Sequence, residues 1–144
     1  MVLNELHFFE QLWSPEDKGK PISKDKAIEL ASKLLLTQRV GYMTHDQDFS
    51  KFYEEATQLI NEISKTEIFA EDVFNHFTKR EVALNKKTIV CEKTPQNVFY
   101  LKEIFELYPN AKVINMVRDP RAIMLSQKNK WNRRNLGGNY MTKR

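Results

Sequence analysis

An arginine and a serine in the C-terminal third of the chain lie where an anion could be held, at the end of an apolar run and on the helical segment that follows it. Arg118 follows the largely apolar run 113–117, and Ser126 lies eight residues farther on, in a segment of helical composition that opens with Asp119-Pro120. Asp suits the N-cap of a helix and Pro its first position. A helix N-terminus attracts anions, and a guanidinium forks onto phosphate oxygens. The spacing fits an anion site, and it fits equally well a surface ion pair of Arg118 with an ordinary helical Ser126.

A second cation follows an earlier run of strand-forming residues. Residues 88–91 read Thr-Ile-Val-Cys, and residues 92–95 read Glu-Lys-Thr-Pro. Ligands of parallel α/β sheets collect at the carboxyl ends of the strands. If both runs are strands, Lys93 and Arg118 lie at the same edge of the sheet, which favours an anion site there. The simpler alternative is a local ion pair between Glu92 and Lys93.

The residues between these two runs predict the helix that connects two parallel strands. Apolar side chains recur there with the period of an amphipathic helix: Val98, Leu101, Ile104, Phe105 and Tyr108. Strand, helix and strand make a βαβ unit with a right-handed crossover. Strands that are apolar along nearly their whole length are covered on both faces. We therefore expect a parallel sheet covered by helices.

The rest of the chain divides into an N-terminal segment, a helical region and a basic tail. Ser23 suits the N-cap of a helix through Leu36, and Gly41 suits a break after it. The apolar period predicts two further helices, over about 46–64 and 66–84. The predicted organisation is accordingly an N-terminal segment 1–12, a helical region 23–86, a βαβ unit 87–131 and a tail 132–144.

Taken together, these segments resemble the sulfotransferase family. The resemblance rests on Glu92-Lys93-Thr94-Pro95, on Tyr108–Lys112, on Arg118–Arg121 with Ser126, and on Asn4–Glu10. The nearest branch holds the carbohydrate enzymes of the heparan sulfate type, the tyrosylprotein enzymes and their bacterial relatives. The matches cover the first ten residues and roughly 88–131, whereas the middle of the chain carries no family signature.

The resemblance implies a role for each matched residue. Arg118 and Ser126 would bind the 3′-phosphate of the donor, 3′-phosphoadenosine 5′-phosphosulfate. Glu5 would be the catalytic base that takes the acceptor proton, and His7 would be an auxiliary polar group. Lys93 would be a cation near the departing oxygen or the acceptor. Without the resemblance, Glu5 reads as a surface charge and His7 as a satisfied core histidine.

The resemblance also implies an α/β fold of the P-loop type, with three layers, a parallel sheet and a helical insertion near the acceptor site. The family's glycine-rich phosphosulfate loop matches none of the four glycines of the sequence. We therefore expect a partial domain, incomplete at both ends, that has no appreciable transfer activity by itself. The acceptor would be a small molecule, a carbohydrate or a protein tyrosine. The alternative is a truncated relative that acts as a binding or interaction module.

Composition and charge exclude several classes of protein. The hydrophobic content of 41% argues against disorder, and no apolar run approaches the ~20 residues that a membrane helix needs. The net charge is +4, but seven basic residues and no acid follow Asp119, so residues 1–119 sum to −3 (+4 − 7). A basic end suits an anionic ligand or a polyanionic acceptor, and nucleic acid is not the expected partner. The alternative is a solvated helix end with favourable cations.

The histidines and the cysteine point to neither a metal site nor a disulfide. His45 and His76 have no partner at metal-ligand spacing, so no metal is predicted. Cys91 is the single cysteine, which excludes an internal disulfide and favours a reducing compartment such as the cytoplasm. Because it ends an apolar strand, its thiol is expected to be buried and inert.

Overall fold

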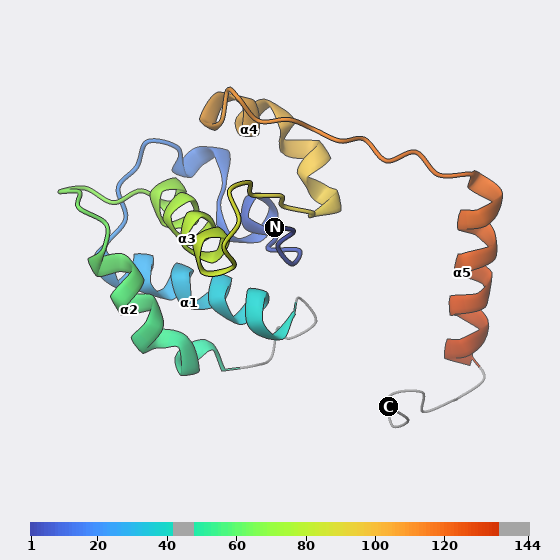
Figure 1. Cartoon of the computed structure of the whole chain (residues 1–144), viewed down its shortest axis with the longest axis horizontal. Coiled ribbons are helices and arrows are strands. Elements are labelled where there is room, and N and C mark those ends of the chain that lie inside the picture. Colours follow the sequence, from blue (N-terminus) through green and yellow to red (C-terminus); the bar gives the residue numbers. More distant parts are fainter. Residues whose placement is uncertain (42–47, 136–144) are drawn as a thin grey trace. The chain divides into compact units, whose positions relative to one another are not determined.

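The computed structural model describes residues 1–41 and 48–135, with the side chains of these residues up to 130. The chain divides into two compact units, Met1–Ala111 and Lys112–Arg144. Figure 1 follows the chain through both units and labels the helices. None of the helices in the described residues is long and apolar enough to span a membrane.

Three helices make up the centre of the first unit: α1 (Lys24–Val40), α2 (Tyr53–Asn61) and α3 (Ala70–Leu84). Helix α1 packs against both α2 and α3 (Figure 1). The helices and the N-terminal segment form one core, with these side chains fully buried at its centre: Phe8, Leu34, Leu35, Leu59, Val73 and Phe77. Because burial of such a side chain contributes roughly 1.5–3 kcal/mol, this core holds the unit together.

Local signals define both ends of α1. The Ser23 hydroxyl accepts the backbone N–H of Lys26, which confirms the predicted N-cap. The helix ends at Gly41, whose N–H donates to the Thr37 carbonyl and whose φ of 105° suits a residue without a side chain. The predicted break at Gly41 is confirmed, and α1 runs one turn beyond the predicted end at Leu36.

Helices form in the other predicted ranges, but they start later than predicted or begin as tighter turns. In the range 46–64, residues 46 and 47 lie outside the described residues, and a 3₁₀ turn, η3 (Phe49–Phe52), precedes α2. In the range 66–84, α3 begins only at Ala70. The helix predicted after residue 94 starts as the 3₁₀ helix η4 (Pro95–Tyr100) and continues as α4 (Leu101–Leu107).

The two predicted strands do not form as strands in the part of the chain that the structure describes. Of residues 88–91, only Cys91 pairs, in an isolated parallel bridge with Val2. Residues 112–117 have no ladder, and their apolar side chains are exposed, with Val117 89% accessible. A parallel strand needs partners along its hydrogen-bonding edge, and within the described residues the run 88–91 has one bridged residue and the run 112–117 has none. The predicted parallel sheet is therefore reduced to one bridge.

Cys91 is exposed, so the expectation of a buried thiol is wrong. The residue does lie at the end of the apolar run 88–91, and its backbone is held on both sides: its N–H donates to the Met1 carbonyl at 2.9 Å and its carbonyl accepts the Leu3 N–H at 2.8 Å. A single bridge positions the backbone but covers no face, so the side chain stays accessible.

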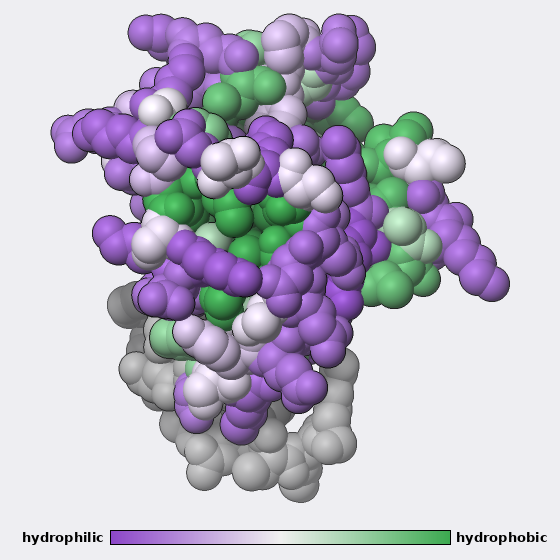
Figure 2. All heavy atoms as spheres, turned by 90° about the vertical axis from the view of Figure 1, so that its left-hand side faces the viewer, coloured by the Kyte–Doolittle hydropathy of each residue, from purple (hydrophilic) through white to green (hydrophobic). Residues whose placement is uncertain are grey.

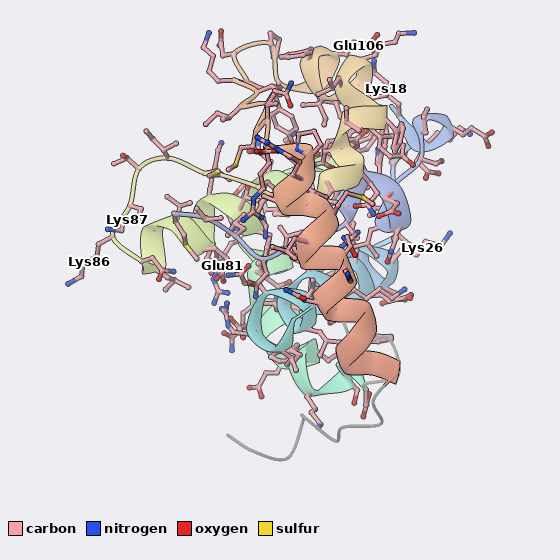
Figure 3. The ribbon with its side chains drawn as sticks, turned by 90° about the vertical axis from the view of Figure 1, so that its right-hand side faces the viewer. Lys18, Lys26, Glu81, Lys86, Lys87 and Glu106 are labelled. Carbon is pink, nitrogen blue, oxygen red and sulfur yellow. The ribbon has the colours of Figure 1, made fainter. Side chains whose placement is uncertain are left out.

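An ion pair joins Lys18, in the N-terminal part of the chain, to Glu106 of α4. The Nζ atom of Lys18 lies 2.5 Å from Oε2 of Glu106, and the two side chains meet in Figure 3. Lys18 follows the 3₁₀ turn η2 (Pro15–Asp17). Its hydrogen bond holds the pKa of the Glu106 carboxyl below the usual value. Both side chains are well exposed, so the pair contributes about 0–1 kcal/mol.

A shallow hollow lies on another side of the first unit. Its volume is about 390 Å³, and isoleucines and polar side chains line it together. Figure 2 shows apolar side chains in the middle of a largely hydrophilic face. The isoleucines that line the hollow are Ile22, Ile60, Ile63 and Ile68. None of the predicted site residues lines it.

The described part of the second unit is an extended segment followed by α5 (Pro120–Asn135). The Asp119 carboxylate accepts the backbone N–H of Arg121 at 2.9 Å, and Pro120 is the first helical residue. The predicted N-cap and helix start are confirmed. The side chains of α5 are exposed as far as Lys130. Of the predicted tail 132–144, residues 136–144 lie outside the described residues.

Candidate active site

Aromatic packing fixes the N-terminal segment that carries Glu5 and His7. The next residues form a π-helical turn, η1 (Phe8–Leu12), and the Phe8 ring stacks on Phe74 of α3 with centroids 4.2 Å apart. Phe9 meets the Phe8 ring edge-on at 5.1 Å. Both phenylalanines are buried. Aromatic pairs of this kind add ~0.5–1.5 kcal/mol beyond area burial, so the segment is anchored directly after His7.

The same segment is also hydrogen-bonded to residues 91–94. The Leu3 N–H donates to the Cys91 carbonyl, and the Leu6 N–H donates to Oε1 of Glu92 at 3.2 Å. The His7 N–H donates to Oγ1 of Thr94, also at 3.2 Å. Two segments that are far apart in the sequence therefore lie side by side.

This contact brings Glu5 and Lys93 together. The Nζ atom of Lys93 lies 3.0 Å from Oε1 of Glu5. The Glu5 side chain is 33% exposed and the Lys93 side chain 66% exposed, so an incoming molecule can reach both. At this exposure the pair contributes about 0–1 kcal/mol to stability. The position of the pair matters more than its strength, because hydrogen bonds fix the backbone beside both Glu5 and Lys93.

His7 lies between two carboxylates. Its Nδ1 atom is 2.5 Å from Oε2 of Glu10, and its Nε2 atom is 3.8 Å from Oε2 of Glu5. The side chain is 3% exposed. Its backbone has φ 52° and ψ 29°, a left-handed conformation that is uncommon for residues other than glycine. His7 is thus buried in the core and also faces Glu5.

The three residues that the sequence predicts as catalytic, Glu5, His7 and Lys93, are therefore neighbours. A carboxylate that is open to solvent can accept a proton from an incoming hydroxyl or amine. An ammonium group beside it can stabilise negative charge that develops on a leaving oxygen. The arrangement has the components of a group-transfer reaction in which a proton is lost at one point and negative charge appears at another.

The predicted phosphate ligands, Arg118 and Ser126, belong to the second unit. Both side chains are exposed. Arg118 forms no ion pair with any acid among the described residues, in contrast to the surface salt bridge that the sequence left open. No hydrogen bond joins it to Ser126 within the described part of the unit. Its guanidinium is accordingly accessible to an external anion.

The N-terminus of α5 is already partly occupied by a carboxylate. Asp119 accepts both the N2 backbone N–H and the guanidinium of Arg121, whose Nη2 atom lies 2.9 Å from Oδ2. These bonds lower the pKa of the Asp119 carboxyl and raise that of Arg121. Pro120 has no N–H to offer. The first turn of α5 thus has fewer N–H donors to offer an external anion than the sequence suggests.

Glu10, Glu92 and Thr94 were not among the predicted catalytic residues, although all three contact the site. Glu10 lies three residues after His7, which was a readable signal for a pair on one helical turn. Glu92 and Thr94 flank Lys93, but their contacts reach Leu6 and His7 across the chain. No local pattern predicts such contacts. Within the described residues, no group of three or more potential ligands is arranged to hold a metal ion.

Comparison with known proteins places the chain in a family. Residues 20–143 match the model of the sulfotransferase family. This range includes Lys93, Arg118 and Ser126, whereas Glu5 and His7 precede it. Neither the curated proteins nor the solved structures give a match. Because the family match extends over most of its length, the chain belongs to the sulfotransferase family.

Proposed function

We propose that the protein transfers a sulfonate group from 3′-phosphoadenosine 5′-phosphosulfate to a hydroxyl or amine, with Glu5 as the base. Family membership supports sulfonate transfer in general. The observation that carries the assignment to this site is the 3.0 Å contact between Lys93 Nζ and Glu5 Oε1. This contact joins a carboxylate and a cation at one accessible point. Glu5 precedes the range of the family match, and Lys93 lies within it.

The proposed step is a direct displacement at sulfur. The acceptor oxygen or nitrogen attacks the sulfonate sulfur and forms the new bond, and the bond from sulfur to the bridging oxygen breaks. The bisphosphate departs with the electron pair, and Glu5 takes the acceptor proton. A well-placed base contributes about 10²–10⁴-fold. Lys93 then stabilises the charge on the departing oxygen or orients the acceptor.

Arg118 and Ser126 are proposed to bind the 3′-phosphate of the donor. The exposed guanidinium of Arg118, unpaired among the described residues, supports the first assignment. Small molecules and carbohydrates are acceptor classes that are consistent with the family.

Binding of adenosine 3′,5′-bisphosphate, measured by titration calorimetry, tests the donor assignment. The protein should bind the bisphosphate more tightly than adenosine 5′-monophosphate. Arg118→Ala should weaken bisphosphate binding about 10- to 100-fold and leave the monophosphate unaffected, because a hydrogen-bonded charge contributes ~1.5–3 kcal/mol. Lys112→Ala, which removes one positive charge from the same exposed segment, is the matched control. Equal affinity for the two nucleotides would contradict the proposal.

A second candidate function is a non-catalytic interaction module. The observation that favours it is the exposure of large apolar side chains in residues 112–117, where Ile114 is 82% and Met116 88% accessible. Apolar groups exposed in series mark interaction surfaces in soluble proteins. A protein that binds no bisphosphate but self-associates through this segment, with Ile114→Lys abolishing association, would support the second function over the first.

A further inference from the structure

The Glu92 carboxylate accepts four hydrogen bonds, all from uncharged groups. The Leu6 N–H donates to Oε1 at 3.2 Å, and the Thr94 N–H donates to Oε2 at 3.1 Å. The Thr94 hydroxyl and the Asn97 side-chain amide donate one bond each. An ionised carboxylate has about four acceptor sites, so these bonds use its capacity. Glu92 is half-buried, and among the described residues no cation pairs with it.

These bonds contradict the local ion pair that the sequence suggests for Glu92 and Lys93. Lys93 turns to Glu5 instead, at 3.0 Å. Neighbouring residues along an extended chain point to opposite sides, so Glu92 and Lys93 face different partners. One faces the backbone of the N-terminal segment, and the other faces the carboxylate that this segment carries.

Thr94 extends the hydrogen-bond network of Glu92 to His7. The Thr94 side chain is 5% exposed, and its hydroxyl donates to Glu92 while it accepts the N–H of His7. Leu6 and His7 immediately follow Glu5, and Glu92 and Thr94 flank Lys93. The network therefore fixes the backbone beside both members of the Glu5–Lys93 pair.

We propose that Glu92 is a positioning residue of the transfer site, acting through Leu6 and Thr94 rather than on the reacting groups. This inference rests on the proposed function, because it assigns Glu92 to the site where Glu5 acts as base. Its carboxylate is saturated by the four donors and is not available to substrate. Its hydrogen bonds fix the position of residues 5–7 relative to residues 92–94. A displacement of about 1 Å there separates the base from the cation and lowers the rate.

Backbone amide hydrogen exchange tests this role without any need for activity. Glu92→Gln keeps the size of the side chain but replaces one acceptor oxygen with a donor. We expect exchange at Leu6 and Thr94 to become at least 10-fold faster in this variant, while exchange in α1 stays unchanged. Glu67→Gln is the matched control, because Glu67 is exposed and has no hydrogen bond or ion pair within the described residues.

Thr94 offers a second route that leaves the charge of Glu92 in place. Thr94→Val removes the hydroxyl at nearly constant volume and should accelerate exchange at His7, whereas Thr94→Ser keeps the hydroxyl and should restore protection. Unchanged exchange at Leu6 in Glu92→Gln, together with unchanged exchange at His7 in Thr94→Val, would overturn the positioning role.

Kinetics separate this inference from the proposed function. In the protein expressed from its complete reading frame, Glu92→Gln should lower kcat about 10-fold or more and change the KM for the donor less than 3-fold. A wild-type protein that binds donor but transfers no sulfonate to any acceptor would sink the proposed function, while the exchange data still decide whether Glu92 fixes the register. A kcat that falls no more than in Glu67→Gln would overturn the inference even if the wild type is active.

Discussion

The guanidinium of Arg39 binds both carboxylate oxygens of Glu81, with Nη1 2.6 Å from Oε2 and Nη2 2.7 Å from Oε1. Arg39 lies in the last turn of α1, and Glu81 lies in α3 with its side chain 2% exposed. The hydrogen bonds to Glu81 are the main reason that the pKa of Arg39 is raised. This bidentate contact joins two helices of the core, α1 and α3.

Removal of Arg39 should destabilise the first unit. Arg39→Ala leaves the buried Glu81 carboxylate without its cation, and the free energy of unfolding should fall by about 2–3 kcal/mol, less than for a wholly buried pair because Arg39 is one-third exposed. Urea denaturation followed by circular dichroism measures this. Arg80→Ala is the control, since among the described residues Arg80 pairs only with the more exposed Glu55, and its loss should cost about 0–1 kcal/mol. Equal losses in the two variants would show that burial of Glu81 has no special effect.

Lys93→Ala should impair transfer while leaving the fold intact. The variant removes the cation that faces Glu5, and loss of one group that stabilises developing charge lowers kcat by about 10²–10³-fold. Steady-state kinetics and a thermal melt together measure this. Lys87→Ala is the matched control, because Lys87 projects away from the rest of the chain in Figure 3. A loss of activity in both variants would point to net charge rather than to the Glu5–Lys93 contact.

Tyr108 makes stability dependent on alkaline pH. Burial raises the pKa of its hydroxyl to about 12, with a further contribution from Glu71 and Asp72. The folded state therefore favours the neutral phenol, and this contribution is complete below pH 10 and is lost as pH rises from 10 towards 12. Between these values stability should fall by about 2–3 kcal/mol from this group.

Tyr108→Phe isolates that effect. Within the described residues the Tyr108 hydroxyl has no hydrogen-bond partner, so its removal should leave stability at pH 8 nearly unchanged. Urea unfolding at pH 8 and pH 11 then compares the two proteins. The same loss between pH 8 and pH 11 in the variant and the wild type would contradict the assignment to Tyr108.

Asp119 should control the start of α5. Asp119→Ala removes the cap on the Arg121 N–H and should increase fraying of the first turn, whereas Asp119→Asn keeps a good cap. Since the pKa of Asp119 is lowered in the folded state, the ionised cap is retained above the ordinary carboxyl range and is lost as pH falls through the lowered value. Amide chemical shifts of residues 121–123 measure the fraying. Identical shifts in the Ala variant and the wild type would exclude a capping role.

Helix ends that are set by hydrogen bonds over a few residues could be predicted from the sequence. Ser23, Gly41 and Asp119 each bond to backbone less than five residues away, so their residue types predict the helix ends. The apolar period likewise predicts α1 and α3, because the same side chains face the core on every turn.

Features that depend on distant segments were harder to predict. The runs 88–91 and 112–117 have the composition of strands, but a strand exists only when another chain segment bonds along its edge. Within these two described runs the one β-bridge is that of Cys91 with Val2. The sequence left open a local ion pair of Glu92 with its neighbour Lys93, whereas the Glu92 carboxylate accepts a hydrogen bond from the Leu6 N–H. The proximity of Glu5 and Lys93 was suggested by the family resemblance and not by any spacing along the chain.

The most direct test of the account is transfer of labelled sulfonate from 3′-phosphoadenosine 5′-phosphosulfate by the protein expressed from its complete reading frame. Sugar hydroxyls, a glucosamine amine and a tyrosine peptide serve as acceptors, and Glu5→Gln is compared with the exposed control Glu16→Gln. If Glu5 is the base, the wild type and the control transfer sulfonate, and Glu5→Gln loses at least 10²-fold in kcat while it retains donor binding. Transfer by Glu5→Gln at the wild-type rate would contradict it.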